Sequence, residues 1–322
     1  MKLVILAFNI GESKGYPVPF VNGPGMSLFN FVKFIKKFNK EIEISVYTQL
    51  ETFRPIKNVP TGTLREKRRI ETDILNADVV HCWSGLTKEV LVYLEYAKKV
   101  SKRIFFGPNL LDTVQPDDES NFLERTKPDK IFFVNDRLRY LAQNKYKLDP
   151  AITGTLIVGP DTEQWAPLPH KSNIILWKGN SNHMVKDVEF ALEVSKKLEK
   201  YKFLFLGYPE KYSYQKHIDK AKRVALYFST SLSETKGMTL LEQWAAGVPS
   251  VTHPKIYQHG INYKTGIVTN RDVDSYCEAI DEIMSDDLMR SDMSKYCVNY
   301  VREQYNPEKL IEKYIGSIKN VG

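Results

Sequence analysis

The residues best suited to chemistry lie in one stretch, STSLSETKGMTLLEQWAAGVPSV, which runs from Ser229 to Val251. A polar loop carries Glu234, a glycine follows at position 237, and the helix expected after it carries Glu242 in its first turn. Glycine lets the backbone approach a ligand closely, and the N–H groups at a helix start attract phosphate. Carboxylates accept hydrogen bonds from hydroxyl groups. The stretch therefore predicts a sugar-nucleotide site, with Glu234 on sugar hydroxyls and Glu242 on a ribose diol.

Each of these acids also has a purely structural explanation. Thr239 and Glu242 have the spacing of a capping box, in which the glutamate only satisfies a backbone N–H at the helix start. Glu234 taken alone would be a solvated loop acid. Only both acids together with Gly237 favour a ligand site.

The surrounding elements would place this loop where a ligand is expected. Short apolar runs such as KLVILAF, ADVVHCW and KFLFLG alternate with longer amphipathic stretches. This alternation predicts βαβ units and buried parallel sheets. In such sheets ligands bind beyond the carboxyl ends of the strands, and the loop after VALYFST lies at such an end. With two sheets facing one another, the cleft between them is the expected site.

The series of runs restarts after DTEQWAPLPHKS, a proline-punctuated stretch that we interpret as a linker. We therefore expect an α/β fold with two Rossmann-like, doubly wound domains. The first is assigned to residues 1–165 and the second to 170–305. In the helical tail, Pro307 is expected to separate two helices.

Composition limits the class of protein. A chain of 322 residues is long enough for two cores, and 42% hydrophobic with 26% charged residues is typical of soluble globular proteins. No apolar run approaches the ~20 residues of a membrane span, and the start is too short and polar for a secretion signal. Three cysteines argue against a disulfide framework, so we expect a cytoplasmic protein. The net charge of +7 favours anionic partners, although it also serves solubility.

The chain resembles the retaining glycosyltransferases of family 4, which have the GT-B fold. The segment ETKGMTLLEQWAAGVPSV is similar to the Glu-x7-Glu signature of that family. LIVGPDTEQWAPLP resembles the family's linker, with Trp165 where phenylalanine is usual, and IILWKGNSNHMVKDVEFAL resembles its phosphate-binding segment. The resemblance covers nearly the whole chain and is densest in the second half. It also implies that the last helix, residues 306–322, packs back on the first domain.

The resemblance implies roles for individual residues on the donor side. Glu242 would bind the ribose and Glu234 the sugar, while Lys186 would neutralise the diphosphate. The family arginine after the conserved glycine is replaced by Asn180, which carries no charge, and Lys178 is a candidate to compensate. A strand neighbour of Gly179 should, however, point the other way. The further donor-binding candidates are Gly237, Met238, Thr239, Gly179, Gly23 and Gly25.

Other candidates lie in the first half of the chain. Asn109 stands near the position of a family histidine that helps to hold the donor sugar, and it can both donate and accept hydrogen bonds. Gly23 and Gly25 resemble the family's Gly-Gly loop, although any strand-to-helix turn can use glycine. Tyr16 and Phe20 are placed at the acceptor entrance. His81, at a strand end, is either an acceptor-side residue or a buried histidine with a backbone partner.

The implied reaction needs neither a metal nor a cofactor. Asp272 and Asp274 have Asp-x-Asp spacing but directly precede a helical pattern, where Asp272 is expected to act as a cap. The pair Asp117 and Asp118 is a weak metal candidate in a polar loop. We expect the departing diphosphate itself to take the proton of the acceptor.

Basic residues in the first half suggest where an acceptor would bind. The run LREKRRI and the lysines of KFIKKFNK (Lys33, Lys36, Lys37 and Lys40) suit an anionic membrane carrying a lipid-linked acceptor. A nucleic-acid backbone or a solvated helix face would explain them equally.

The function predicted is transfer of a hexose or related sugar from a nucleoside diphosphate to a hydroxyl of a cell-envelope glycan or lipid-linked saccharide. Three alternatives stay open. They are a phage-type DNA glycosyltransferase acting on hydroxymethylated bases, a sugar-nucleotide epimerase, and a non-catalytic sugar-nucleotide-binding protein. The sequence does not decide the sugar, the base, the linkage or the oligomeric state.

Overall fold

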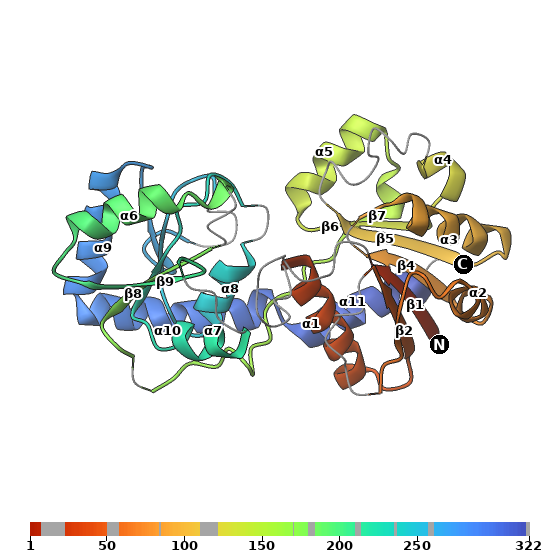
Figure 1. Ribbon diagram of the computed structural model, residues 1–322, viewed down its shortest axis with the longest axis horizontal. Helices are drawn as coiled ribbons and strands as arrows, with labels where there is room; N and C mark the ends of the chain where they lie inside the picture. Colours follow the sequence, from red (N-terminus) through yellow and green to blue (C-terminus); the bar gives the residue numbers. More distant parts are fainter. Residues whose placement is uncertain are drawn as a thin grey trace. The chain divides into compact units, whose positions relative to one another are not determined.

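The computed structural model describes residues 1–7, 23–49, 58–83, 85–109, 122–169, 171–179, 184–209, 214–234, 237–256 and 261–319. These residues form two compact units (Figure 1). The described part of the first unit runs to Val158 and resumes at Pro307, and the second unit runs from Gly159 to Asn306. The division lies at Val158 rather than at the expected Trp165, and the last helix is part of the first unit.

The first unit contains a parallel sheet in the order β3-β2-β1-β4-β5-β6-β7. The strand order reverses beside β1, as in a doubly wound fold. Its strands are β1 (Lys2–Ala7), β2 (Glu43–Thr48), β3 (Thr61–Thr63), β4 (Val79–Trp83), β5 (Arg103–Asn109), β6 (Lys130–Phe133) and β7 (Thr153–Thr155). Its helices are α1 (Gly23–Phe38), α2 (Lys67–Leu75), α3 (Lys88–Lys99), α4 (Phe122–Thr126), α5 (Asp136–Tyr146), the 3-10 turn η3 (Pro150–Ile152) and α11 (Pro307–Lys319).

The two faces of this sheet bury different helices. Along β1, Leu3 and Ile5 belong to a core shared with α1 and α11, whereas Val4 and Leu6 pack with α2 and α3. This alternation is the period of two that a pleated strand imposes. A strand buried on both faces has to be apolar throughout, which is why KLVILA is a continuous apolar run after its lysine.

The second unit contains a smaller parallel sheet in the order β12-β11-β10-β8-β9. Its strands are β8 (Ile174–Lys178), β9 (Lys202–Leu206), β10 (Leu226–Phe228), β11 (Ser250–Thr252) and β12 (Gly266–Val268). Its helices are the 3-10 turn η4 (Met184–Lys186), α6 (Val188–Lys197), α7 (Tyr214–Ala221), α8 (Met238–Ala245), α9 (Val273–Ser285) and α10 (Asp287–Gln304).

One face of the second sheet packs against α6 and α9. Ile175 and Trp177 of β8 share a core with Val194 of α6 and Ile280 of α9. Lys178, the next residue along β8, is on the opposite face, where it contacts α8. Because side chains alternate between the two faces of a strand, Lys178 lies on the face of β8 that is turned toward α8.

Two local predictions, a cap at Asp272 and a helix break at Pro307, are confirmed. Asp272 caps α9 by accepting a hydrogen bond from the Ser275 N–H at 2.8 Å. Pro307 begins α11, so the helical tail is divided there. The cysteines Cys82, Cys277 and Cys297 are free and buried. Among the described helices, none is long and apolar enough to cross a membrane.

Candidate functional site

Two acid–lysine pairs lie beyond the carboxyl ends of strands in the second unit. Lys186 of η4 forms an ion pair with Glu234, in the loop after β10. Lys178, the last residue of β8, forms a second ion pair with Glu242 of α8, with 2.8 Å between Nζ and Oε2. Each of the two predicted acids is therefore bound to a lysine, one at the end of β8 and the other at the end of η4.

The loop that carries Glu234 is fastened to η4 through a buried threonine. Trp177 Nε1 donates to Thr230 Oγ1 at 2.8 Å, and the Thr230 hydroxyl donates to the Lys186 carbonyl at 2.8 Å. The Leu232 N–H donates to the Val185 carbonyl at 2.8 Å. These bonds hold the loop against the turn that presents Lys186.

Glu234 itself remains partly accessible. The Ser231 hydroxyl donates to its Oε1 at 3.1 Å, and His253 Nε2 donates to the Ser231 carbonyl at 2.7 Å. The side chains of Lys186 and Glu234 are 28% and 23% exposed. A ligand can therefore reach both charged groups.

The pair of Lys178 and Glu242 is more deeply buried, with side chains only 9% and 5% exposed. The Lys178 ammonium also lies 5.3 Å from the centre of the Trp165 ring, a cation–π contact. Removing one partner of such a pair leaves a buried charge without compensation, which is strongly destabilising. Glu242 is therefore held in a defined position.

The capping-box explanation of Glu242 is wrong. Helix α8 begins at Met238, its N-cap is Gly237, and no side chain caps it. Glu242 consequently lies in the second turn rather than the first, and its carboxylate binds Lys178. Gly237 has φ of 60°, a left-handed conformation that glycine adopts without steric cost. The uncapped N–H groups at Met238 and Thr239 suit an anion.

Gly179 is required by close packing. A Cβ at this position would lie 2.8 Å from the Trp177 ring and 3.2 Å from Lys186 Cβ. Its N–H donates to the Leu206 carbonyl at 3.1 Å. The absence of a side chain at Gly179 thus lets the segment carrying Lys186 pass close to the end of β8.

Tyr227 is a buried residue near the two acids that the sequence reasoning missed. Burial raises the pKa of its phenol, and both Glu234 and Glu242 raise it further. The neutral phenol therefore lies near both acids. The alternation of side chains along the strand could have predicted this position. Leu226 and Phe228 of β10 face α6 and α9, so Tyr227 between them faces the α8 side.

The assignment of His81 to the acceptor side is not supported by its position. His81 is fully buried; Nδ1 lies 2.7 Å from the Tyr314 hydroxyl and Nε2 lies 2.7 Å from the Gly107 carbonyl. Its ring also stacks on Tyr314 at 5.5 Å. Both ring nitrogens are occupied and no surface is exposed. This is the alternative stated above, a buried histidine with a backbone partner.

Other predicted site residues lie outside the described residues or at the start of α1. Asn180, Tyr16 and Phe20 lie outside the described residues, as does the side chain of Asn109, although Asn109 is the last residue of β5. Gly23 and Gly25 form the first turn of α1 rather than a preceding loop. The roles assigned to all of them stay predictions.

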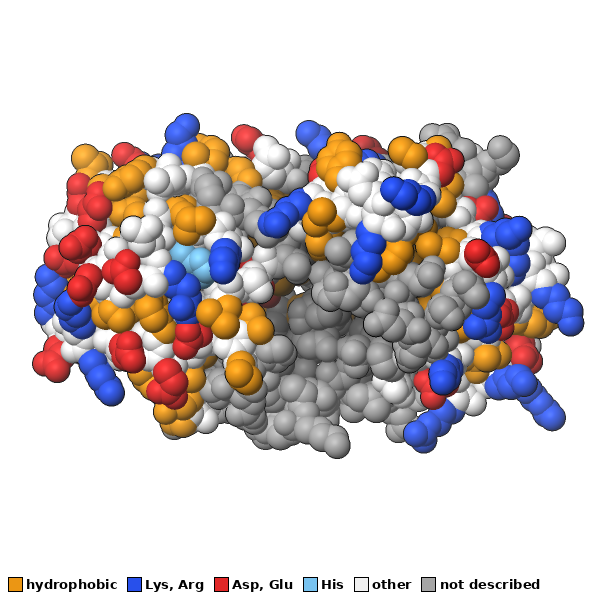
Figure 2. All heavy atoms as spheres, turned by 90° about the horizontal axis from the view of Figure 1, so that it is seen from above, with side chains coloured by type: hydrophobic (Ala, Val, Ile, Leu, Met, Phe, Trp, Pro, Cys, Tyr) orange, Lys and Arg blue, Asp and Glu red, His pale blue; other side chains and the backbone are white. Residues whose placement is uncertain are grey.

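The basic run LREKRRI is partly neutralised in the structure. Arg69 lies 2.7 Å from Glu66 and over the Tyr47 ring at 5.6 Å, and Lys67 lies 3.9 Å from Glu71. On the face seen in Figure 2, basic side chains are interspersed with acidic ones. Residues 67–70 of this run thus lie in α2, and local ion pairs partly neutralise their charges.

Within the described residues, no three or more His, Cys, Asp or Glu side chains are grouped so that they could hold a metal ion. Asp117 and Asp118 lie outside those residues.

No family model matches the chain, and no curated protein matches it in sequence. Solved structures do share its fold. A glycosyltransferase from Rickettsia africae has a TM-score of 0.76 at 13% identity, covering 99% of this chain and 98% of that one. Sucrose-phosphate synthase from Thermosynechococcus elongatus has a TM-score of 0.73 at 11% identity, covering 100% and 99%. HepE from Anabaena, solved with UDP and glucose, has a TM-score of 0.73 at 12% identity, covering 99% of both chains.

The expected fold class is confirmed. The chain has two parallel α/β sheets, and the similar structures include proteins named as glycosyltransferases. Identities of 11% to 13% show the fold alone, so the activity is argued from the site.

Proposed function

We propose that the chain is a retaining, metal-independent glycosyltransferase of family 4. It moves a sugar, of the hexose type, from a nucleoside diphosphate to the hydroxyl of an acceptor. The observation that carries this proposal is the pair of lysine–glutamate contacts beside the uncapped start of α8. Two acids for hydroxyl groups, and Lys186 with the N–H groups at the start of α8 for phosphate, match the chemistry of a sugar nucleotide.

The two ion pairs differ in exposure, and we therefore assign them to different parts of the donor molecule. Lys186 and Glu234 are partly accessible, which suits the reacting end, where phosphate and sugar meet. Lys178 and Glu242 are nearly buried, which suits a fixed contact to the ribose. Gly237 would let the diphosphate approach the start of α8.

In the proposed reaction, negative charge develops on the departing diphosphate. Lys186 and the N–H groups at the start of α8 would stabilise that charge, and stabilising groups of this kind supply much of an enzyme's rate enhancement. The leaving phosphate oxygen would take the proton of the acceptor hydroxyl on the same face, so no side-chain base is assigned. Activity retained in EDTA would agree with metal independence, and a metal requirement would contradict it.

The proposed acceptor is a cell-envelope glycan or a lipid-linked saccharide, bound through the first unit. Support comes from the lysines of α1, of which Lys37 is exposed while Lys33 and Lys36 are half-buried. Basic helices of this type suit an anionic membrane surface.

The decisive experiment measures thermal unfolding with UDP, GDP, ADP, CDP and TDP. UDP is the first choice because HepE was solved with it. A ligand at about 100 times its Kd should stabilise the folded protein by about 2.7 kcal/mol. Glu242→Gln should weaken this effect, whereas Glu278→Gln, an exposed acid on α9, serves as control. If none of the five nucleotides stabilises the native protein, the proposal fails.

A further inference from the structure

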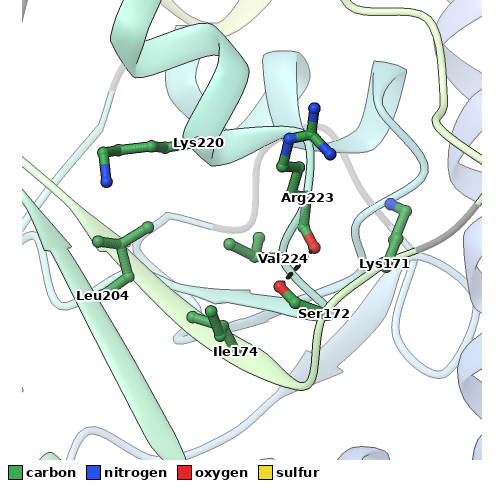
Figure 3. A pocket seen from close by; sticks show the side chains of 7 residues that line it. All are labelled: Lys171, Ser172, Ile174, Leu204, Lys220, Arg223 and Val224. Carbon is green, nitrogen blue, oxygen red and sulfur yellow. Dashed lines mark hydrogen bonds between the residues drawn. The ribbon is translucent and has the colours of Figure 1, made fainter.

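A cavity of about 480 Å³ lies in the second unit, between α7 and the amino-terminal parts of β8 and β9 (Figure 3). Ile174, Leu204 and Val224 present apolar side chains to it. The Arg223 guanidinium points away from these side chains, and the Lys171 ammonium is bound to two backbone carbonyls beyond α8. These two basic groups do not converge on the apolar side chains, so they do not define a ligand site.

At the opposite, carboxyl end of the same sheet, the loop after β10 is held through its backbone. Three successive carbonyl oxygens of this loop each accept a hydrogen bond from a side chain of another segment. The pairs are the Tyr276 hydroxyl with the Ser229 carbonyl at 2.7 Å, Arg271 Nη2 with the Thr230 carbonyl at 3.4 Å, and His253 Nε2 with the Ser231 carbonyl at 2.7 Å. The path of the chain that leads to Glu234 is therefore fixed by the segments after β11 and β12.

Arg271 also binds the turn that presents Lys186. Its Nη2 forms an ion pair with the carboxylate of Asp187, the residue that directly follows Lys186. The guanidinium lies 4.7 Å from the centre of the Phe190 ring on α6, a cation–π contact. One nitrogen of Arg271 thus joins the loop that carries Glu234 to the turn that carries Lys186.

Asp187 is held in place by further bonds. It is the N-cap of α6, where its Oδ1 accepts from the Phe190 N–H at 3.3 Å while its Oδ2 binds Arg271. Its φ of 47° lies in the left-handed region, which aspartate tolerates better than most residues. The Thr230 hydroxyl lies 2.9 Å from the Asp187 carbonyl. The backbone beside Lys186 is therefore tied to Arg271 through Asp187.

The segments that carry the two reacting groups are short and irregular. Lys186 ends η4, a 3-10 turn of three residues, and Glu234 lies in the loop beyond the end of β10. Hydrogen-bond geometry in 3-10 turns is poorer than in α-helices, so such a turn gains from contacts outside itself. A displacement of about 1 Å in a reacting group can lower a rate by about 10²-fold. The bonds of Arg271 are placed where they would prevent such a displacement.

We propose that Arg271 is a positioning residue for the proposed sugar transfer. Together with Asp187 and the Thr230 carbonyl it forms a clamp between loop and turn. The clamp keeps Lys186 at the leaving phosphate and Glu234 at the sugar. The kinetic consequence rests on the proposed function, whereas the clamp itself is a property of the fold.

Steady-state transfer by Arg271→Met tests the kinetic part. Methionine keeps an unbranched side chain against Phe190 but removes the cation. The kcat should fall about tenfold or more, while the KM for the donor changes much less, because the buried pair of Lys178 and Glu242 holds the ribose end. Arg271→Lys keeps a cation for both acceptors and should retain more of the native kcat. Equal losses in the two variants would contradict the role of the cation.

Combination with Lys186→Ala separates positioning from general structural support. Because Arg271 acts through Lys186, Arg271→Met should lower kcat by a much smaller factor in the Lys186→Ala background than in the native chain. The same factor in both backgrounds would show a general effect on the fold and overturn the proposal.

Hydrogen exchange tests the clamp without any assay of activity. The Leu232 N–H donates to the Val185 carbonyl at 2.8 Å, so this amide reports whether loop and turn stay together. Its exchange should become about tenfold faster in Arg271→Met and in Asp187→Asn. Asparagine keeps a capping oxygen and tolerates the left-handed backbone, so Asp187→Asn removes chiefly the ion pair.

Asp274→Asn is the matched control. It breaks the exposed ion pair of Asp274 with Lys197, which also links α9 to α6, and it should leave exchange at Leu232 unchanged. Unchanged exchange in both Arg271→Met and Asp187→Asn would overturn the proposal. Faster exchange throughout β8 and β10 would overturn it as well, since it would show general destabilisation. If the native chain binds no nucleotide and transfers no sugar, the proposed function fails, and the exchange data still decide whether the clamp exists.

Discussion

At the scale of single residues, Glu234 gives the most direct test of the proposed chemistry. Glu234→Ala should lower transfer by about 10²-fold or more, because the sugar loses its anionic hydrogen-bond acceptor. The side chain is 23% exposed and lies in a loop, so the fold should persist. A coupled transfer assay measures the rate, and circular dichroism monitors folding. A folded and fully active variant would remove Glu234 from the site.

Lys186 is expected to act on the leaving group. Lys186→Ala should lower kcat by about 10²-fold, the usual cost of losing one charge-stabilising donor. Because Lys186 is half-buried, its loss should change stability much less than kcat. Lys196→Ala, a lysine near the end of α6, provides the matched control. An unchanged kcat in Lys186→Ala would contradict the phosphate role.

His81 should make stability depend on pH. Burial lowers its pKa to about 4, so the folded protein takes up this proton less readily than the unfolded chain, whose histidines titrate near 6.5. The free energy of unfolding should therefore fall as the pH drops from about 6.5 toward 4. His217, whose pKa burial lowers to about 3, acts in the same direction.

Comparison with His81→Gln isolates this contribution. Urea unfolding at several pH values should show the variant less stable at pH 7, with the difference from the native protein shrinking toward pH 4. A difference that is constant with pH would show that His81 does not titrate as described.

The sequence predicted the two acids, Lys186 and the glycine at the helix start, because residue type and spacing encode that chemistry locally. It did not predict which lysine pairs with Glu242, since that partner, Lys178, lies 64 residues away in the sequence, on strand β8. Tyr227 was missed for the same reason: an aromatic residue in a buried strand looks like core until its facing side chains are known. His81 is the opposite case: the sequence allowed a site role, but the side chain is buried in the core. Its partner Tyr314 lies 233 residues away in the sequence, so this burial could not be inferred locally.

At the scale of elements, Gly266 controls the pairing of β11 and β12. Its φ is 145°, and a Cβ there would lie 1.8 Å from the Ser250 carbonyl oxygen, the backbone of the partner strand. Gly266→Ala should therefore lower the free energy of unfolding by about 3 kcal/mol or more. Chemical denaturation of the variant and of the native protein measures this difference in the free energy of unfolding.

Gly316 offers the matched control for that substitution. It lies inside α11, and a Cβ there meets nothing within 4 Å. Gly316→Ala should stabilise by up to about 1 kcal/mol, because alanine is the better helix former. Equal effects at the two positions would contradict the steric explanation.

Most long strands and helices were predictable because their apolar periodicity is local. The short strands β3 and β7 were not, since each has the sequence TGT, which carries no apolar pattern. They are strands because neighbours β2 and β6 supply hydrogen-bonding edges. The register of α8 was misjudged because Thr239 mimics a cap, whereas the left-handed Gly237 is the N-cap, so the helix begins two positions earlier.

At the scale of the whole molecule, α11 completes the core of the first unit. Ile311, Tyr314 and Ile318 are each 1% exposed and pack with α1 and β1. A chain ending at Asn306 would expose that apolar surface and leave His81 without its tyrosine partner.

Hydrogen exchange measured by mass spectrometry tests this expectation. In the chain that ends at Asn306, amides of β1 and β4 should lose protection, while those of β8 and β10 should keep it, because the second unit has its own core. Unchanged protection in β1 and β4 would show that the first unit does not need α11.

The position of α11 also has a consequence for biosynthesis. During translation, the whole second unit is synthesised before α11, the helix that completes the core of the first unit. Until α11 is made, residues 1–158 therefore leave exposed the apolar surface of the first sheet that α11 covers in the folded protein. The second unit, although made later, has a core that does not depend on α11. During that interval the nascent amino-terminal half is the part of the chain most in need of a chaperone.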